Sequence, residues 1–237
     1  MKILKIFLSL VIISVIGFGS YHGLFLSDLT KIKEITIVGA NPNLEKELQK
    51  MHGIVPGTSF WKTDVDQLAA KLKKHAWVEN IEIKKNFPNE ITVQVTERKP
   101  KALLNKGQGK FDYIDDSGFV FGPAKPIDAS EKVVLSGKSL IEKSELREAA
   151  IEVVKQFPPS GAMSLSDVSE IQFNNEKGYQ VVLSKTGMIV DLGKENLPVR
   201  VDRARRVVQY LESHQINASH IDADYAKKVL VKVRKDR

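Results

Sequence analysis

Residues 76–100 read AWVENIEIKKNFPNEITVQVTERKP, and this stretch decides the fold of the first domain. The runs Val78–Lys84 and Glu90–Thr96 are rich in β-branched residues, as strands are. Phe87-Pro88-Asn89 lies between them and supplies turn-forming residues. The stretch therefore predicts two consecutive strands joined by a short turn.

The residues before this stretch extend the same small domain. Residues 32–38 read IKEITIV, which predicts a further strand that ends at Gly39. Two helices follow, and Thr63 is the expected N-cap of the second. Their apolar stripes are Leu44, Leu48 and Met51, then Val65, Leu68, Ala69 and Leu72. The order strand–helix–helix–strand–strand predicts a small sheet with two helices on one face.

The residues after Arg98-Lys99-Pro100-Lys101 predict a second domain made mainly of strands. Strands at 111–114 and 119–121 flank a hairpin turn, and a short buried strand follows at 133–135. The runs 168–173, 179–184 and 188–192 predict an antiparallel meander, and strands at 221–222 and 229–233 close the chain. Helices are expected from Ser139, where Glu142 forms a capping box, to Phe157, and from about Pro198.

The N-terminal residues predict an export or anchoring signal. Lys2 and Lys5 precede an uncharged, largely apolar run at 6–26, which as a helix would be about as long as a bilayer core is thick. The flanking charges place the N-terminus in the cytoplasm. A cleaved signal peptide with a site near Gly17-Phe18-Gly19 is the alternative. Both interpretations place the rest of the chain outside the cytoplasm.

Composition excludes several classes of protein. The chain has 237 residues, and its 42 % hydrophobic content is enough for a packed core. It has no cysteine, which excludes a disulfide scaffold, thiolate metal sites and a cysteine nucleophile. The net charge of +7 is spread along the chain without aromatic-interleaved motifs, so we expect no nucleic-acid partner.

Motifs that would carry catalysis are incomplete in this sequence. Gly137-Lys138-Ser139 resembles the end of a phosphate-binding loop, but Lys132 stands where the motif needs glycine. Asp112 and the two aspartates after it fail the spacing of a calcium loop, because Pro123 occupies its twelfth position. We therefore expect no enzyme, cofactor, metal site or small-molecule substrate. The arginines at 200–206 are interpreted as a solvated helix face, with a partner or lipid contact as the alternative.

A series of short local patterns runs along the chain in a fixed order. The patterns are Ile37-Val38-Gly39, Pro56-Gly57-Thr58, Ala76-Trp77-Val78, Asn86-Phe87-Pro88-Asn89, Glu97-Arg98-Lys99-Pro100, Asp115–Phe121, Leu135-Ser136-Gly137, Leu192-Gly193 and Ile221-Asp222 with Tyr225. In this order they resemble the FtsQ/DivIB family of bacterial cell-division proteins, and the resemblance covers nearly the whole chain from the apolar segment onward. Ala76 departs from the family pattern, because it stands where proline is usual before Trp77.

The resemblance implies an α+β chain with a cytoplasmic tail at 1–5, a transmembrane helix at 6–26, a POTRA domain at 31–99 and a mainly antiparallel β domain with flanking helices at 100–237. It further implies a non-enzymatic, single-pass scaffold of the division complex in the inner membrane at the septum. The expected partners are FtsB and FtsL, which are small bitopic division proteins, and other divisome proteins.

In the family, FtsB docks on the last strands of the β domain, and the matching region here is Asp224–Val233. The expected partner-binding residues are Asp224, Tyr225, Lys227, Lys228, Val229, Val231 and Val233. The alternating valines fit an edge that accepts a partner strand, although a simple interior strand would show the same pattern. Asp224 stands where the family has arginine and Lys228 replaces a glycine-like position, so a partner's charge preference is expected to differ.

Two other functions compete with the divisome scaffold. A POTRA-type chaperone module of an outer-membrane assembly or secretion system would normally carry a barrel, and the sequence lacks a series of ten-residue membrane strands. An exported hydrolase would need a convergent nucleophile or acid–base cluster in a cleft.

Overall fold

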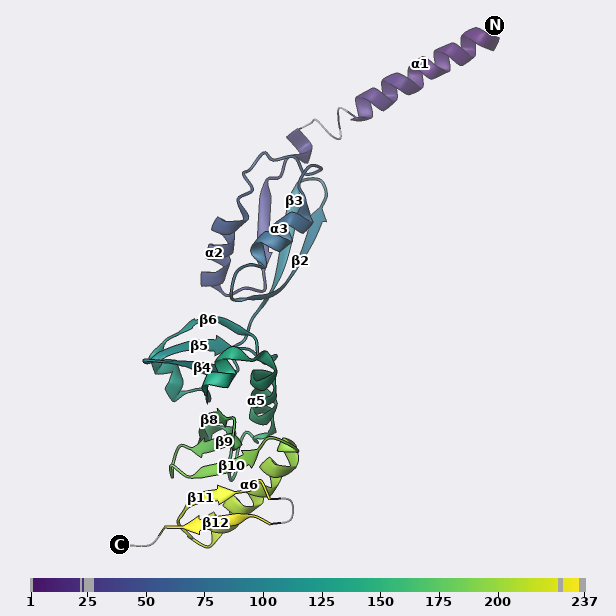
Figure 1. The fold of residues 1–237 in the computed structure, drawn as a ribbon. Helices are drawn as coiled ribbons and strands as arrows, with labels where there is room; N and C mark the ends of the chain where they lie inside the picture. The colour runs from purple at the N-terminus through teal and green to yellow at the C-terminus, as the bar shows by residue number, and fades with distance from the viewer. Residues whose placement is uncertain (1, 22, 24–27, 226–227, 235–237) are drawn as a thin grey trace. The chain divides into compact units, whose positions relative to one another are not determined.

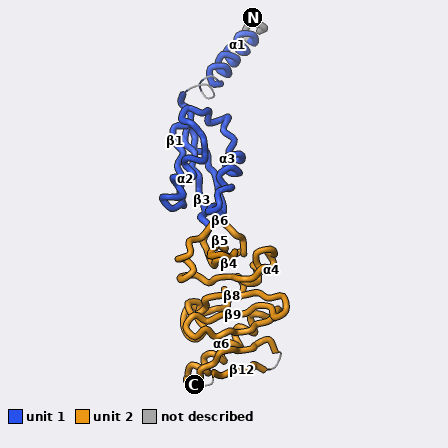
Figure 2. The backbone as a smooth tube through the Cα atoms, turned by 60° about the vertical axis from the view of Figure 1, so that its left-hand side comes forward, with its two compact units in different colours: residues 1–98 blue, residues 99–237 orange. Residues whose placement is uncertain are grey.

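The computed structural model describes residues 2–21, 23, 28–225 and 228–234, with side chains described from residue 6 onward. The chain divides into two compact units, Met1–Arg98 and Lys99–Arg237, which Figure 2 shows in different colours. Each unit has its own hydrophobic core and is described by itself.

Residues 34–97 of unit 1 form a three-stranded sheet and two helices (Figure 1). The sheet order is β1-β3-β2, with β3 parallel to β1 and antiparallel to β2. The predicted order of strand, helix, helix, strand and strand is confirmed. The bounds are β1 Glu34–Val38, α2 Pro42–His52, α3 Val65–Leu72, β2 Val78–Asn86 and β3 Glu90–Glu97.

The core of unit 1 lies between the sheet and the two helices. Alternate residues of β3 are buried, as expected for a strand with one covered face. They pack with the predicted helix stripes, of which Leu48 and Leu72 are fully buried. Trp77 packs against this core, whereas Trp61 is 42 % exposed.

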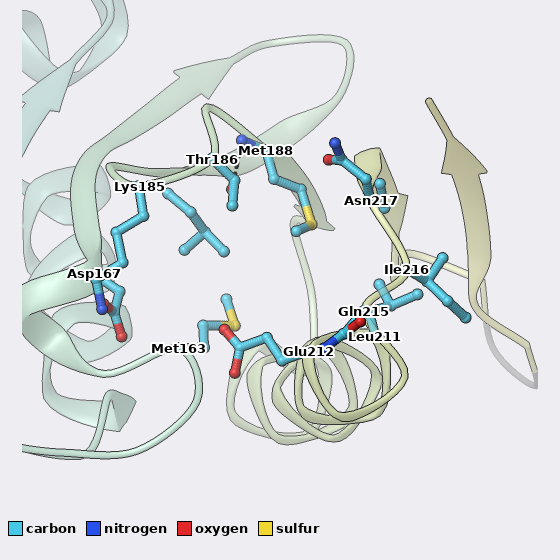
Figure 3. Close-up of a pocket in the computed structure, with 12 residues that line it drawn as sticks. Met163, Asp167, Lys185, Thr186, Met188, Leu211, Glu212, Gln215, Ile216 and Asn217 are labelled. Carbon is cyan, nitrogen blue, oxygen red and sulfur yellow. Dashed lines mark hydrogen bonds and ion pairs between the residues drawn. The ribbon is translucent and has the colours of Figure 1, made fainter. Parts of the chain in front are cut away.

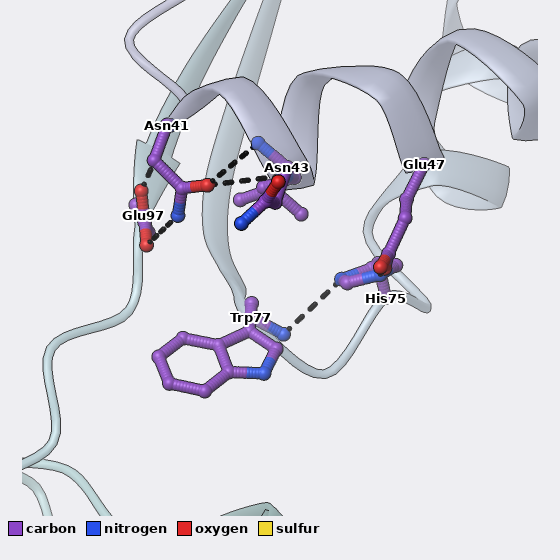
Figure 4. A network of polar contacts seen from close by, with 7 residues as sticks. Asn41, Asn43, Glu47, His75, Trp77 and Glu97 are labelled. Atoms are coloured by element: carbon purple, nitrogen blue, oxygen red, sulfur yellow. Dashed lines mark hydrogen bonds and ion pairs between the residues drawn. The ribbon is translucent and has the colours of Figure 1, made fainter.

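Side-chain caps fix the starts of α2 and α3. Asn41 accepts hydrogen bonds from the N–H groups of Asn43 and Leu44, and its own side chain donates to Glu97 at 2.6 Å (Figure 4). The N-cap of α3 is Asp64, so the prediction of Thr63 is wrong. The Thr63 hydroxyl instead donates to the Ser59 carbonyl at 2.8 Å, in the turn before the helix.

Unit 2 is built on a nine-stranded sheet in the order β12-β11-β10-β9-β8-β7-β4-β5-β6. The meander β8-β9-β10 is antiparallel as predicted, whereas β4-β7, β7-β8 and β10-β11 are parallel pairs. The bounds are β4 Ala102–Gly107, β5 Lys110–Ile114, β6 Val120–Ala124, β7 Val134–Ser136, β8 Val168–Asn174, β9 Gly178–Leu183, β10 Ile189–Gly193, β11 Ala218–Asp222 and β12 Leu230–Val233.

Helices α4 Lys138–Glu142, α5 Ser144–Gln156 and α6 Leu197–Ser213 flank this sheet, and α5 and α6 share its core. Short 3-10 turns lie at Asp28–Thr30, Pro126–Ser130 and Leu165–Asp167. The mainly β domain with flanking helices is therefore confirmed, although its sheet is mixed.

The single helix predicted from Ser139 to Phe157 is wrong in two respects. Lys143 has extended backbone angles and divides it into α4 and α5. Ser139 is not the cap, because α4 begins after Gly137 and the Ser139 hydroxyl contacts Asn175 at 3.0 Å. The Arg147 guanidinium donates to the carbonyls of Leu140 and Ile141 at the end of α4. These bonds satisfy groups that a continuous helix would have paired internally.

The N-terminal segment forms helix α1 at Lys2–Tyr21. Among the described residues, no helix has both the length and the apolar character needed to cross a membrane. The predicted transmembrane segment at 6–26 is not confirmed, and its residues 22 and 24–27 lie outside the described part of the chain.

Candidate partner-binding edge

Strand β12 is a terminal strand of the nine-stranded sheet (Figure 1). It pairs antiparallel with β11, with Leu230 opposite Asp222 and Val231 opposite Ile221. Within the described residues, no strand pairs with its outer side. The predicted closing strand is therefore at an edge, and its backbone groups on that side are available to another chain.

The side chains of β12 are apolar and exposed at the same time. Leu230, Val231 and Val233 are 44 %, 37 % and 53 % exposed, and Lys232 between them is exposed as well. An exposed apolar edge strand is a site for pairing with another chain unless something covers it. Val229, which was expected in this strand, precedes it and packs partly buried against the core.

The segment before β12 is tied to helix α6 by two arginines. Arg200 donates to the Leu192 carbonyl at 2.7 Å and forms an ion pair with the Asp224 carboxylate. Arg203 donates to the Tyr225 carbonyl at 2.6 Å. Asp224 therefore has a partner inside its own domain. The arginines of α6 include two that position the approach to the edge, rather than forming only a solvated face.

Gly193 makes room for this arrangement at the end of β10. Its φ is +74°, a left-handed conformation that favours glycine. A Cβ at this position would overlap both the Arg200 guanidinium and the Asp224 carboxylate. The glycine therefore lets α6, β10 and the segment at Asp224 approach one another closely.

Two predicted site residues form a small exposed pair. The Lys228 ammonium lies over the Tyr225 ring, 5.3 Å from its centroid, and the Tyr225 side chain is 45 % exposed. This is the geometry of a cation–π contact, which places a cation and an aromatic face beside the edge. Lys227 lies outside the described residues.

Polar contacts also fix the strands behind the edge. His220 on β11 lies 2.9 Å from the Asp191 carboxylate on β10, and Gln180 on β9 donates to the same carboxylate at 2.5 Å. At the end of β12, Arg234 donates through its backbone to Asn217 and through its side chain to the Thr186 carbonyl, both at 2.8 Å. The edge thus rests on a sheet whose register is held by side chains.

A cavity of about 250 Å³ lies where the β9–β10 hairpin meets the end of α6 (Figure 3). Met163, Met188 and Leu211 give it an apolar interior, and the Asp167–Lys185 ion pair at 2.7 Å lies on its rim. Burial alone would raise the pKa of Asp167, but bonds from Lys185 and Ser164 outweigh it and lower the pKa below its usual value. The interior of this cavity suits an apolar group.

Among the residues that the structure describes, no group of three or more histidine or acidic side chains could hold a metal ion.

Comparison with known proteins identifies the family. Residues 102–224 match the C-terminal domain model of the cell division protein FtsQ/DivIB, and residues 30–98 match the FtsQ-type POTRA model. The chain belongs to the FtsQ/DivIB family. The resemblance seen in the motif order is therefore confirmed, and the FtsQ/DivIB C-terminal match ends at Asp224, before β12 begins.

Relatives in the FtsQ/DivIB family align along most of the chain. The cell division protein FtsQ of Geobacter sp. is 26 % identical over 227 residues, which are 92 % of this chain and 82 % of the relative. FtsQ of Anaeromyxobacter sp. is 29 % identical over 83 % of this chain and 69 % of its own. The cell division protein DivIB of Bacillus cytotoxicus is 22 % identical over 79 % of this chain and 72 % of its own.

Sequence reasoning placed β12 but missed the contacts that shape its surroundings. Arg200 and Asp224 are far apart in the sequence, and their pairing follows only from the way α6 packs beside β10. Gly193 belongs to a Leu-Gly pattern of the sequence, but nothing in that pattern predicts that the glycine lies against the Arg200 guanidinium.

Proposed function

We propose that this chain is a non-enzymatic scaffold of the bacterial divisome that binds FtsB and FtsL through the outer edge of β12. The observation that carries the proposal is an exposed apolar strand at the end of a sheet in a chain of the FtsQ/DivIB family. A partner segment in an extended conformation would add a tenth strand, with backbone hydrogen bonds supplying affinity and side chains supplying specificity.

The side chains around β12 support a partner with both apolar and acidic residues. Val231 and Val233 present apolar surface, while Lys228, Lys232 and Arg234 add positive charge along the same segment. Asp224 adds little negative charge of its own, because Arg200 neutralises it. The loss of the family's arginine at this position is thus offset by the lysines that follow it.

We propose in addition that residues 6–26 anchor the chain in the inner membrane, with residues 1–5 in the cytoplasm and the POTRA and β domains outside it. The described residues 6–21 contain no charged side chain, and their side chains are exposed around the whole helix. A helix with apolar side chains on every side needs a membrane or a protein to cover it. Mass measurement of the N-terminus from membranes distinguishes an intact anchor from a cleaved signal peptide.

The direct test of the scaffold role is a pull-down of the full-length chain, in detergent, with the extracytoplasmic segments of FtsB and FtsL from the same organism. Val231→Glu and Tyr225→Ala should each abolish or strongly reduce capture. Ile127→Glu is the matched control, because Ile127 is an apolar residue of unit 2 that is 69 % exposed away from β12. If both edge variants still capture the partners, the binding site lies elsewhere on the chain. If the unaltered chain captures neither FtsB nor FtsL, the proposal that they are its partners is wrong.

A further inference from the structure

Exposed apolar side chains gather at one end of unit 1, and we name this set the aromatic pole. It consists of Leu29, Val55, Trp61 and Phe87, which are 68 %, 68 %, 42 % and 61 % exposed. They come from three segments: the entry to the domain, the loop before α3, and the β2–β3 turn. Isolated exposed apolar residues are ordinary, but a cluster from separate segments marks an interaction surface.

Hydrogen bonds hold the three segments of the aromatic pole together. The N–H of Phe60 donates to the Thr30 carbonyl at 2.9 Å, and the Asn89 side chain donates to the Leu29 carbonyl at 3.4 Å. Lys85 donates to the Phe60 carbonyl at 3.0 Å, which joins β2 to the loop. The pole is therefore part of the folded domain rather than a loose chain end.

The rings of the pole pack edge-on against the buried ring of Phe60. Phe60 is only 4 % exposed, and its ring meets Trp61 edge-on with centroids 5.4 Å apart and Phe87 edge-on at 6.3 Å. Trp61 and Phe87 are themselves 6.1 Å apart. The exposed rings thus have fixed positions, which lowers the entropy that they would lose on binding.

Lysines surround these rings. Lys31, Lys33, Lys62 and Lys85 are all exposed and lie on the same three segments. Lys31 pairs with Asp28 at 2.5 Å, and Asp64 and Glu90 lie at the ends of the other two segments, so four lysines stand against three carboxylates. The pole therefore combines aromatic rings with an excess of positive charge. That combination is typical of protein surfaces at the headgroup level of membranes.

The pole also lies where the chain enters unit 1 from helix α1. Only residues 22–27 separate Tyr21 at the end of α1 from Asp28 at the start of η2. A fully extended chain covers at most about 3.6 Å per residue, so this connection spans at most about 25 Å. If α1 is anchored in the bilayer, as proposed above, the pole stays within reach of the headgroups.

We propose that the aromatic pole docks on the outer surface of the membrane by contacting anionic phospholipid headgroups. Trp61 and Phe87 insert at the level of the headgroups, and the surrounding lysines attract lipid phosphates. The docked pole holds the POTRA domain against the bilayer and gives it a defined orientation beside the anchor. This inference rests on the anchor of the proposed function and adds a lipid-binding surface to it.

The test uses the full-length chain in nanodiscs, and the absence of cysteine makes single spin labels simple to place. Labels at Val55→Cys in the pole, Glu79→Cys at the start of β2 and Val15→Cys in α1 report membrane depth through their accessibility to oxygen and to a water-soluble nickel complex. Nanodiscs of phosphatidylcholine alone are compared with nanodiscs containing roughly one-third phosphatidylglycerol.

Docking predicts that the label at residue 55 is shielded from nickel in the anionic nanodiscs, while the label at residue 79 stays in water. Lys62→Glu changes the charge of the pole by two units, which should lower the ratio of docked to undocked protein by about 25-fold. Lys73→Glu, the same change at the far end of α3, should have much less effect.

Each outcome decides a different part of the proposal. If the label at residue 15 lies within the bilayer but the label at residue 55 lies in water in both lipid mixtures, docking is overturned and the anchor stands. The aromatic pole would then be assigned to a protein partner. A label at residue 15 in water overturns the anchor and docking together. Recognition of the lipid charge is overturned if the label at residue 55 is shielded equally with and without anionic lipid. It is also overturned if Lys62→Glu and Lys73→Glu lower docking equally.

Discussion

Replacing Gly193 by alanine should disturb the approach to β12 more than an ordinary glycine substitution does. The first contribution is conformational, because alanine at a φ of +74° costs about 1 kcal/mol. The second is steric, since the new Cβ overlaps Arg200 and Asp224 and displaces the guanidinium from the Leu192 carbonyl. A hydrogen bond to a charged group contributes about 2 kcal/mol, which gives an expected total of about 3 kcal/mol.

Gly187→Ala is the matched control for this prediction. Gly187 also has a left-handed conformation, with a φ of +64°, but a Cβ there would meet nothing within 4 Å. Its expected cost is therefore the conformational part alone, about 1 kcal/mol. The difference of about 2 kcal/mol between the two variants measures the contribution of the Arg200 and Asp224 contacts.

Hydrogen exchange with mass spectrometry is the appropriate assay, because it reports the stability of peptides from β10 to β12 separately from the rest of the chain. Both tryptophans, Trp61 and Trp77, belong to unit 1, so their fluorescence monitors that unit during the same denaturant series. Gly193→Ala should also weaken capture of FtsB and FtsL, because it moves the segment at Asp224. Equal destabilisation by Gly193→Ala and Gly187→Ala would refute the packing argument.

Three further predictions concern unit 2. Arg203→Gln should weaken partner capture but change the free energy of unfolding by no more than about one-half kcal/mol, because the bond from Arg203 to the Tyr225 carbonyl lies on the surface. Capture equal to that of the unaltered chain would exclude a positioning role for Arg203. Tyr179→Phe should destabilise unit 2 by about 1 kcal/mol, because the Tyr179 hydroxyl donates to the Leu146 carbonyl at 2.8 Å and joins α5 to the sheet. Chemical denaturation measures the loss of stability, and an unchanged midpoint would show that water replaces the bond. Asp167 has a pKa below its ordinary value of 3.8, so the stability it contributes is complete above that value and is lost as the pH falls through its lower folded pKa. Asp167→Asn should therefore cost about 1 kcal/mol at pH 7 and little at the lowest pH in a pH series of denaturation curves, and a cost independent of pH would contradict the role of the charge.

The sequence predicted the parts of the fold that depend on local periodicity. The order of elements in unit 1 and the meander β8-β9-β10 follow from runs of apolar residues and turn signals that lie close together. It failed where a particular side-chain contact, rather than the apolar periodicity, determines where a helix begins or ends. Thr63 carries the right side chain for a cap, but the Ser59 carbonyl takes its hydroxyl. The break at Lys143 depends on Arg147, which caps α4 from the next helix.

The candidate site was also predicted only in part: the strand was predicted, but the contacts around it were not. Alternating valines identified the last strand, and family resemblance favoured an edge over an interior position. The structure places β12 at the edge beside β11, but the contacts that position the segment before it come from α6, more than twenty residues earlier. The exposure of Trp61 could not be predicted either, because hydrophobicity alone does not tell a buried ring from an exposed one.

The most direct test of the central claim is hydrogen exchange of the full-length chain with and without the extracytoplasmic segments of FtsB and FtsL. If a partner strand adds to β12, amides within Leu230–Val233 that face outward should exchange much more slowly in the complex, because they acquire backbone hydrogen-bond partners. Peptides from β6, at the opposite edge of the sheet, should not change. Binding that leaves β12 unprotected and slows exchange elsewhere would contradict the account.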